Sequence, residues 1–431
     1  MKHIRTLLLL AVLGCLCACS DHDDNKPLQP GETAQRTVLI YMCAQNSLGF
    51  YNCHATDSAE IMNAHASVAR HNRLLMFIDD NKAPRLYQVT AQDNAPKLLK
   101  QWNTDICAAS PRRFQEVLEI VAKDYPAREY GLVMWSHADG WIPATNTNYP
   151  SFEGPASGSR TQIRPFSFGI DSGPTGGMGD NGAQMNVEDM AQAIADAGIH
   201  CRYIFFDACL MQNLEVAYAL RHQTDYIVAS PMAIPSAGSY YTNEVAQGLF
   251  SDDPADIARL YLQDVQDAAL SSLYGNYGLV ISCLQTDKLE PLAEALKEAL
   301  PRSALAGRQS PDMSQVLNYQ AYCSNYYYRP HNYDARQSLA ALLDPADTAR
   351  VQQALNEVIT YYGATQRYWI GPSYNDYQTM PLDTDNYRGV SLFVPQKVYT
   401  DRAKSTPHGD LNTSFSQTEW YKAAGFDATG W

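Results

Sequence analysis

Residues 202–220, RYIFFDACLMQNLEVAYAL, decide the fold of this chain. The run from Tyr203 to Phe206 is apolar and has strand length, and apolar residues then recur at helical spacing up to Leu220. A strand that passes directly into a helix would place Cys209 at the helix N-terminus. Free backbone N–H groups and the helix dipole favour a thiolate at that position. The alternative is a buried core cysteine without chemical function.

A second strand end carries a histidine. Residues 131–141, GLVMWSHADGW, form an apolar run that stops in a polar turn containing His137. In an open parallel sheet the carboxyl ends of the strands lie at one edge, where ligands bind. A lone histidine after a strand is more often structural than functional. A histidine and a cysteine that each follow directly after an apolar strand are a rarer combination and favour a function. We therefore predict that His137 and Cys209 come within reach of each other.

The order of apolar runs predicts an α/β fold. Strands are expected over residues 37–42 and 74–78, an amphipathic helix over residues 114–124, and a late helix over residues 351–362. Strands alternating with helices indicate a three-layer sandwich, with a mostly parallel central sheet and helices on both faces. An α/β extension is expected at the C-terminal end.

At the two strand ends the chain resembles the clostripain family of cysteine peptidases, which are caspase-like in fold. That family has a His-Gly turn after one strand and Asp-Ala-Cys after the next, as in SHADGW at residues 136–141 and FDACLM at residues 206–211. Weaker similarity covers residues 38–48 and 389–395. The resemblance implies a caspase-like catalytic domain and a cysteine endopeptidase (a hydrolase) that works through a His137/Cys209 dyad.

Amide hydrolysis needs a nucleophile, a proton carrier and donors for the oxyanion. Cys209 would attack as a thiolate stabilised by the helix start and by protonated His137, whose imidazole would then protonate the leaving amine. No third residue is required. The backbone N–H groups of Ala138 and Cys209 would hold the oxyanion. The family usually has glycine where this chain has Ala138. If that position needs a positive φ, alanine would disturb the turn and weaken the prediction that its N–H holds the oxyanion.

Asp207 is the candidate substrate-binding residue. It lies two positions before Cys209 and therefore shares a face with it in an extended strand. A buried carboxylate needs a cationic or hydrogen-bonding partner, which a P1 arginine or lysine would supply; the alternative is that Asp207 caps the following helix. Family members that prefer arginine have a second acid on the next loop, where this chain has Ala237. The P1 residue is thus left open among lysine, arginine and a smaller residue.

The segment 142–185 is rich in Pro, Gly and Ser, which is typical of a functional loop or of a surface insertion. In the clostripain family the corresponding segment is where precursors are cut into two chains. The resemblance therefore makes Arg160 and Arg164 candidate processing sites.

The N-terminus has the pattern of an export signal. Two basic residues precede a short apolar run that ends at Cys19, and residues 1–19 resemble a bacterial lipoprotein signal. Cys19 is the expected lipidation site, with Cys15 as the rival. A flexible tether over residues 20–36, a catalytic domain over 37–250 and a C-terminal subdomain over 251–431, packed on the same core, would follow. We expect an exported lipoprotein on a bacterial membrane, periplasm-facing or surface-exposed.

Composition limits the partners. A formal net charge of −14 without a basic cluster argues against nucleic acid. Seven cysteines follow the signal, and no C-x-x-C pair suggests zinc. The chemistry requires no metal or cofactor. Some relatives need calcium, and this chain could bind it too, although its sequence contains no calcium-binding loop motif. The expected partners are a peptide or protein substrate and, through the lipid, the membrane, with the chain itself monomeric. The alternative function is a lipid-anchored caspase-like binding protein that is catalytically weak or inactive.

Overall fold

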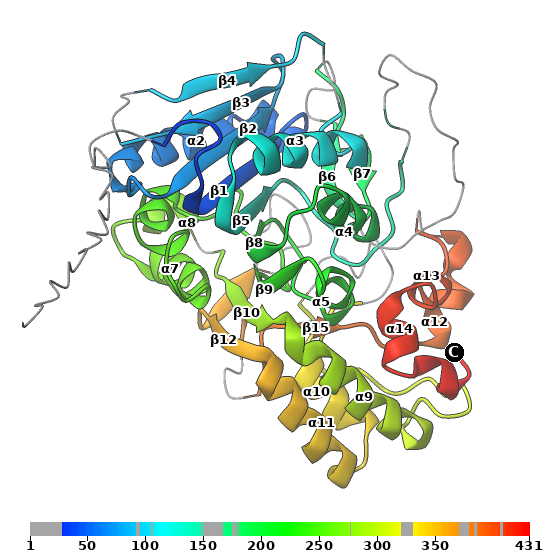
Figure 1. The fold of residues 1–431 in the computed structure, drawn as a ribbon. Coiled ribbons are helices and arrows are strands. Elements are labelled where there is room, and N and C mark those ends of the chain that lie inside the picture. The colour runs from blue at the N-terminus through cyan, green and yellow to red at the C-terminus, as the bar shows by residue number, and fades with distance from the viewer. Residues whose placement is uncertain are drawn as a thin grey trace, which may run out of the picture.

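The computed structural model describes residues 28–91, 95–104, 107–147, 149, 167–174, 179–180, 182–275, 277–319, 331–369, 379–382, 386–405 and 408–431. Helices pack on both sides of one large sheet (Figure 1). Cys15, Cys19, Arg160 and Arg164 lie outside the described residues.

The large sheet has nine strands in the order β12-β10-β9-β8-β5-β1-β2-β3-β4. Its five inner strands are all parallel, and the strands on either side of them pair antiparallel. The inner strands are β9 (Thr224–Ala229), β8 (Cys201–Asp207), β5 (Ala127–Trp135), β1 (Ala34–Cys43) and β2 (Arg73–Asp79). The outer strands are β3 (Arg85–Val89), β4 (Lys97–Gln101), β10 (Val280–Gln285) and β12 (Ile359–Ala364). The predicted α/β class, with its mainly parallel centre, is confirmed.

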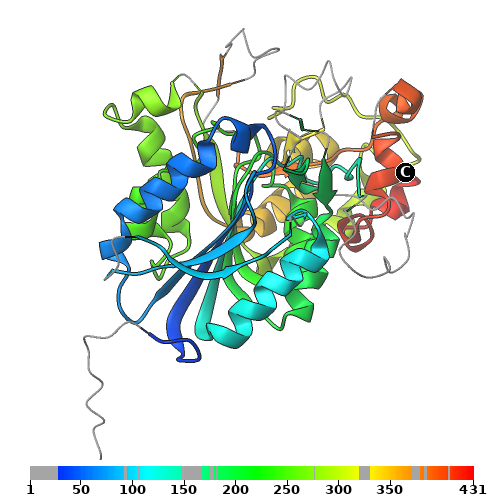
Figure 2. The same cartoon turned by 90° about the horizontal axis from the view of Figure 1, so that it is seen from above.

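Both faces of the sheet are covered, which explains why the inner strands have continuous apolar runs such as VLIYM in β1 and YIFF in β8. Successive residues of β1 point to opposite faces, so that Ile40 lies in one apolar core and Tyr41 in the other. In Figure 2 the helix α2 (Cys53–Asn63) and the helix α7 (Ala255–Gln266) lie on one side of the sheet, and α3 (Pro111–Asp124) lies on the other. The helices α4 (Val187–Asp196), α5 (Leu214–Leu220) and α9 (Leu289–Ala299) share the core of α3.

The remaining elements connect or extend these layers. They are α1 (Ser47–Phe50), η1 (His65–Ser67), β6 (Phe168–Asp171), β7 (Ala183–Met185), α6 (Tyr241–Asn243), η2 (Glu244–Gly248), α8 (Ser271–Tyr274), η3 (Thr286–Lys288), η4 (Leu300–Arg302), β11 (Tyr333–Asp334), α10 (Ala335–Leu342), α11 (Pro345–Val358), β13 (Arg367–Trp369), β14 (Thr379–Pro381), β15 (Ser391–Leu392), α12 (Lys397–Asp401), η6 (Ala403–Ser405), α13 (Leu411–Phe415), α14 (Glu419–Ala423) and η7 (Phe426–Thr429). Among all the described helices, none is long and apolar enough to cross a bilayer.

The late helix differs from its prediction. Helix α11 ends at Val358, and residues 359–364 form strand β12 instead of a further turn of helix. This segment pairs antiparallel with β10 and completes one edge of the large sheet. Its sequence, ITYYGA, is rich in β-branched and aromatic residues, so the ladder on β10 outweighs the helical spacing of the preceding residues.

Candidate active site

The register of β5 and β8 sets the positions of the two candidate catalytic residues. These strands are parallel neighbours, and Trp135 pairs directly with Asp207 at their carboxyl ends. His137 and Cys209 each follow two residues later. Both therefore leave the same edge of the sheet from adjacent strands. Within the described residues, no hydrogen bond joins the imidazole to the sulfur.

Cys209 lies in a turn and not at a helix N-terminus, so that expectation was wrong. Helix α5 begins only at Leu214, and Asn213 caps it by accepting a hydrogen bond from Val216 N. In between, Leu210 has a left-handed φ of 65°, which turns the chain out of the strand. The helix dipole, which acts over the first turn of a helix, is therefore not available to the thiol.

The surroundings of Cys209 keep its sulfur protonated. Burial raises the pKa of the Cys209 thiol to about 11, and the carboxyl groups of Asp139 and Asp207 add to the effect. The Cys209 Sγ accepts a hydrogen bond from Ile234 N at 3.4 Å, which opposes the shift. The side chain is nevertheless partly exposed, so a reagent or substrate can reach it. The Cys209 side chain is thus a thiol in this environment.

Two side chains contact the His137 imidazole at the same nitrogen. Its Nε2 lies 2.9 Å from Ser47 Oγ and 3.6 Å from Asp180 Oδ1. Ser47 Oγ in turn donates to Asp180 Oδ2 at 2.9 Å. Burial lowers the pKa of His137, and Asp180 acts in the opposite direction. Sequence reasoning missed both Ser47 and Asp180; the only signal was that Ser47 lies in the weakly similar segment 38–48.

Asn46 fixes the loop that brings Ser47 to the site. Its side-chain oxygen accepts hydrogen bonds from Leu48 N and Gly49 N, and its amide donates to Cys43 O and Ile170 O. Asn46 is fully buried, so these bonds are protected from water. The end of β1 is thereby fastened to the strand β6, beside the turn that carries His137.

Gly140 holds the His137 turn against the Cys209 turn. It has a φ of 65°, and a Cβ atom added there would lie 2.4 Å from Leu210 O and 2.7 Å from Asn213 Nδ2. Asn213 Nδ2 also donates to Leu210 O at 2.7 Å. Only glycine fits both the backbone conformation and this close approach.

The backbone around Ala138 is compatible with an oxyanion donor. Ala138 does not have a positive φ, so glycine is not needed there. The neighbouring groups pair with strand β6: Gly169 N donates to His137 O, and Asp139 N donates to Ser167 O. The Ala138 N–H makes no hydrogen bond to any described residue and remains available.

Asp207 lies under the loop that follows β9. It accepts hydrogen bonds from Ser239 N at 3.2 Å and from the Tyr241 hydroxyl at 2.9 Å. A Cβ atom added to Gly238 would lie 2.6 Å from Asp207 Oδ2, so the loop covers the carboxyl group closely. Burial raises the pKa of Asp207 to about 6. Because Asn213 caps α5, the alternative role of Asp207 as a helix cap is wrong.

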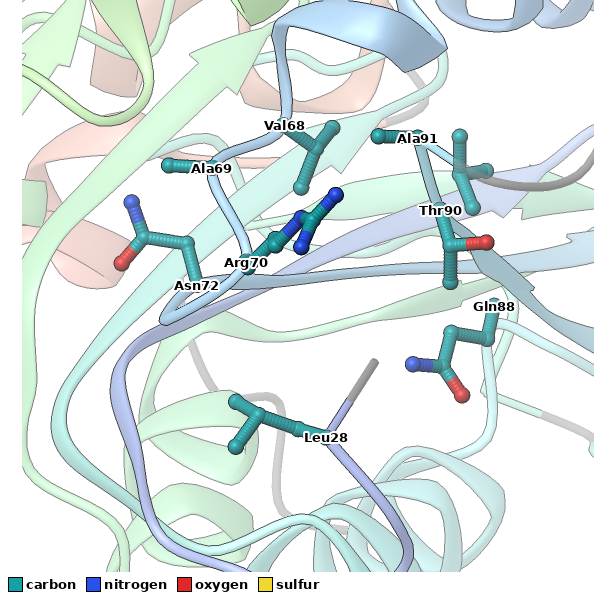
Figure 3. Close-up of a pocket in the computed structure, with 9 residues that line it drawn as sticks. Leu28, Val68, Ala69, Arg70, Asn72, Gln88, Thr90 and Ala91 are labelled. Carbon is teal, nitrogen blue, oxygen red and sulfur yellow. The ribbon is translucent and has the colours of Figure 1, made fainter. Parts of the chain in front are cut away.

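A separate pocket lies away from these residues (Figure 3). Its lining includes Val68 and Arg70, which precede β2, and Gln88 and Thr90 at the end of β3. Since β3 runs antiparallel to β2, this is the amino end of the parallel strands. The pocket therefore lies at the edge of the sheet opposite to His137 and Cys209.

Comparisons with known proteins agree with this geometry. The sequence model of the Clostripain family matches residues 40–154 and 176–425. Among solved structures, a secreted C11 cysteine protease from Bacteroides thetaiotaomicron in complex with an irreversible peptide inhibitor is 25% identical, covers 92% of this chain and 100% of its own, and has a TM-score of 0.73. An inactive zymogen C11 protease from Parabacteroides distasonis is 24% identical. The match covers 91% of this chain and 99% of that protein, and its TM-score of 0.69 shows the shared fold. The search of curated proteins gave no match.

Proposed function

This chain belongs to the Clostripain family and is a cysteine protease, and we propose that it cleaves peptide bonds with Cys209 as nucleophile and His137 as proton carrier. The observation that carries the proposal is the pairing of Trp135 with Asp207, because it brings the ends of both strands to one edge of the sheet. The side chains of His137 and Cys209 are partly exposed at this edge, as a site for an extended peptide requires.

The reaction would begin from a neutral thiol and a neutral imidazole. Burial raises the pKa of Cys209 and lowers that of His137, so a preformed thiolate–imidazolium pair is disfavoured. His137 would accept the thiol proton as the sulfur bonds to the substrate carbonyl carbon. The imidazolium would then give that proton to the leaving nitrogen as the C–N bond breaks. Water would hydrolyse the resulting thioester and release the free thiol.

The negative charge of the tetrahedral intermediate needs donors that are already in place. The N–H of Ala138 has no partner among the described residues, and the N–H of Cys209 lies beside its own sulfur. These two groups come from the two adjacent strand ends. They are the proposed oxyanion donors, and the negative φ range of Ala138 removes the objection to alanine at that position.

The proposed P1 residue is basic. Asp207 is 4% exposed and lacks a Lys, Arg or His partner within the described residues. A charge-assisted bond from a substrate cation would compensate for the burial of this carboxylate. Internal cleavage after Arg160 or Arg164 in the segment 142–185 follows from the same specificity.

Export and anchoring form a separate part of the proposal. The chain resembles a lipoprotein at Cys19, with Cys15 as the rival, and the B. thetaiotaomicron relative is secreted. We place the protein on a bacterial membrane through lipid, as a monomer facing the periplasm or the outside. The proposal includes no calcium site. The described residues contain no group of three or more His, Cys, Asp or Glu side chains arranged to hold a metal ion.

The second candidate function is a lipid-anchored binding protein with weak or absent turnover. The contact of Ser47 and Asp180 with His137 favours it, because an imidazole held at Nε2 has one nitrogen fewer for proton transfer. The two functions make different predictions for the reactivity of Cys209.

Fluorogenic peptides with P1 Arg, Lys or Ala test the proposal on the exported protein, before and after limited processing. We expect cleavage after basic residues, abolished in Cys209→Ala and His137→Ala. Iodoacetamide should label Cys209 at neutral pH in the wild type and much more slowly in His137→Ala. No cleavage of any peptide together with unselective labelling would favour the binding protein.

A further inference from the structure

The Asp139 side chain lies on the same side of its chain segment as His137. The segment that begins at His137 pairs antiparallel with β6 around a bridge between Ala138 and Phe168. Gly169 N donates to His137 O at 2.9 Å, as this pairing requires. Side chains alternate in such an extended segment, and the Ala138 methyl group lies in the apolar core. The side chains of His137 and Asp139 therefore both face away from that core, and both are partly exposed.

The Asp139 carboxyl group lies close enough to Cys209 to act on its sulfur. Of the two carboxyl groups that raise the pKa of the Cys209 thiol, Asp139 has a larger effect than Asp207, which lies only two residues from Cys209. Among the described residues no hydrogen bond joins the Asp139 carboxyl group to the sulfur, so the effect acts through space. Asp139 thus borders the position where the sulfur meets the substrate.

No protein cation compensates for the charge of Asp139. Its side chain forms no hydrogen bond and no ion pair with any residue that the structure describes, and burial alone raises its pKa to about 6. The other carboxylate on this side, Asp180, contacts His137 and Ser47 but no described Lys or Arg. A carboxylate that faces the nucleophile opposes the formation of a thiolate. Asp139 therefore hinders the chemistry unless a cation comes from outside the protein.

The order of the strands assigns Asp139 to the side of the leaving group. Strand β8, which leads to Cys209, lies between β9 and β5. The Asp207 carboxyl group faces the loop that follows β9, so a P1 side chain bound there lies on the β9 side of the sulfur. His137 and Asp139 follow β5 on the other side, and His137 gives its proton to the leaving nitrogen. The substrate residue after the cleaved bond, P1′, therefore passes Asp139.

We infer that Asp139 binds a basic side chain, lysine or arginine, at the P1′ position of the substrate. This inference rests on the proposed protease function and adds a second specificity residue to Asp207. A cation at P1′ satisfies the carboxylate and cancels its unfavourable action on a thiolate at Cys209. A basic P1′ residue thus improves binding and also makes the sulfur easier to ionise, so kcat should respond together with KM.

Internally quenched peptides that differ only at P1′ test the assignment: lysine, arginine and citrulline, the neutral isostere of arginine. We expect wild-type kcat/KM to be at least about 10-fold higher with lysine or arginine than with citrulline, as one charge-assisted hydrogen bond provides. In Asp139→Asn the three values should lie within about 3-fold of each other.

Two controls accompany these peptides. A peptidyl coumarin amide has no P1′ side chain, and Asp139→Asn should cleave it faster than the wild type, because the carboxylate no longer opposes the thiolate. Asp196→Asn lies at an exposed position at the end of α4 and keeps an acceptor for Gln192. It should leave every ratio unchanged.

Methanethiosulfonate reagents of opposite charge test the position of Asp139 without proteolysis. The Cys209 thiolate attacks the thiol sulfur of the reagent, an S–S bond forms and methanesulfinate leaves. We compare the rate with the cationic trimethylammonioethyl reagent to that with the anionic sulfonatoethyl reagent, by mass mapping of the Cys209 peptide. This rate ratio should be at least about 5-fold higher in the wild type than in Asp139→Asn at low ionic strength.

The outcomes separate the roles that Asp139 could have. Equal losses for all peptides and for the coumarin amide in Asp139→Asn would show that Asp139 only supports the turn, and would overturn the inference. A changed reagent ratio with an unchanged P1′ preference in Asp139→Asn would overturn the P1′ assignment. A wild type that cleaves the coumarin amide without preferring a basic P1′ residue would overturn the inference and leave the protease function intact. A wild type that cleaves none of the substrates would refute the protease function itself.

Discussion

Replacing Gly140 by alanine tests the contact between the turns that carry His137 and Cys209. The added Cβ would lie 2.4 Å from Leu210 O, and the backbone would keep a φ of 65°. A left-handed conformation costs a non-glycine residue about 1–2 kcal/mol. Overpacking against backbone adds about 1–3 kcal/mol. We therefore expect Gly140→Ala to lose about 2–5 kcal/mol in the free energy of unfolding.

Gly198 offers a matched control. It has a φ of 70°, but a Cβ atom there would meet no atom within 4 Å. Gly198→Ala should therefore lose only the conformational part, about 1–2 kcal/mol. The difference between the two variants in urea unfolding isolates the contact with the Cys209 turn.

The same substitution should impair the reaction, because it pushes Leu210 and with it Cys209 away from the His137 turn. A displacement of about 1 Å at a reacting group costs on the order of 100-fold in rate. We expect kcat/KM of Gly140→Ala to fall by about that factor, with slower alkylation of Cys209 by iodoacetamide. Equal losses of stability in both glycine variants, with normal kcat/KM in Gly140→Ala, would refute the reasoning.

Three further variants test other parts of the site. Asp207→Asn should abolish the preference for basic P1 residues in the peptide assay. Because the pKa of Asp207 is raised to about 6, ionising this carboxyl group destabilises the wild type as pH rises from about 4 through 6. The variant's free energy of unfolding, relative to wild type, should therefore be about 2 kcal/mol larger at pH 8 than at pH 4, and a pH-independent difference would contradict this. Ala138→Gly should leave kcat/KM within about 2-fold, since the φ there is not positive; a large gain would mean that the alanine methyl group obstructs the oxyanion site. Asp180→Asn should lower the pKa of His137, measured by NMR titration, because it removes the carboxylate that raises it; an unchanged midpoint would show that the 3.6 Å pair has no electrostatic effect in solution.

Apolar strand runs were enough to predict the class of fold, and two short motifs were enough to predict that His137 and Cys209 follow neighbouring strand ends. The reason is that the signal is local: consecutive residues show a buried strand followed by a polar turn. Neighbouring parallel strands then end at the same edge of the sheet. The edge strand β12 could not be predicted in this way. Its residues continue a helical pattern, and only pairing with β10 decides their conformation.

The electrostatic state of the site was decided by tertiary structure. Residue order suggested a helix start at Cys209, but the left-handed turn at Leu210 and the cap at Asn213 delay the helix to Leu214, and burial raises the pKa of the thiol. Ser47 and Asp180 reach His137 from segments that lie far before it and far after it in the chain. Glu60 and Asp207 both accept hydrogen bonds from Tyr241, which lies far from each of them in the sequence. The sequence by itself determines which residues end the strands, whereas charge, exposure and partners depend on groups that folding brings in from distant segments.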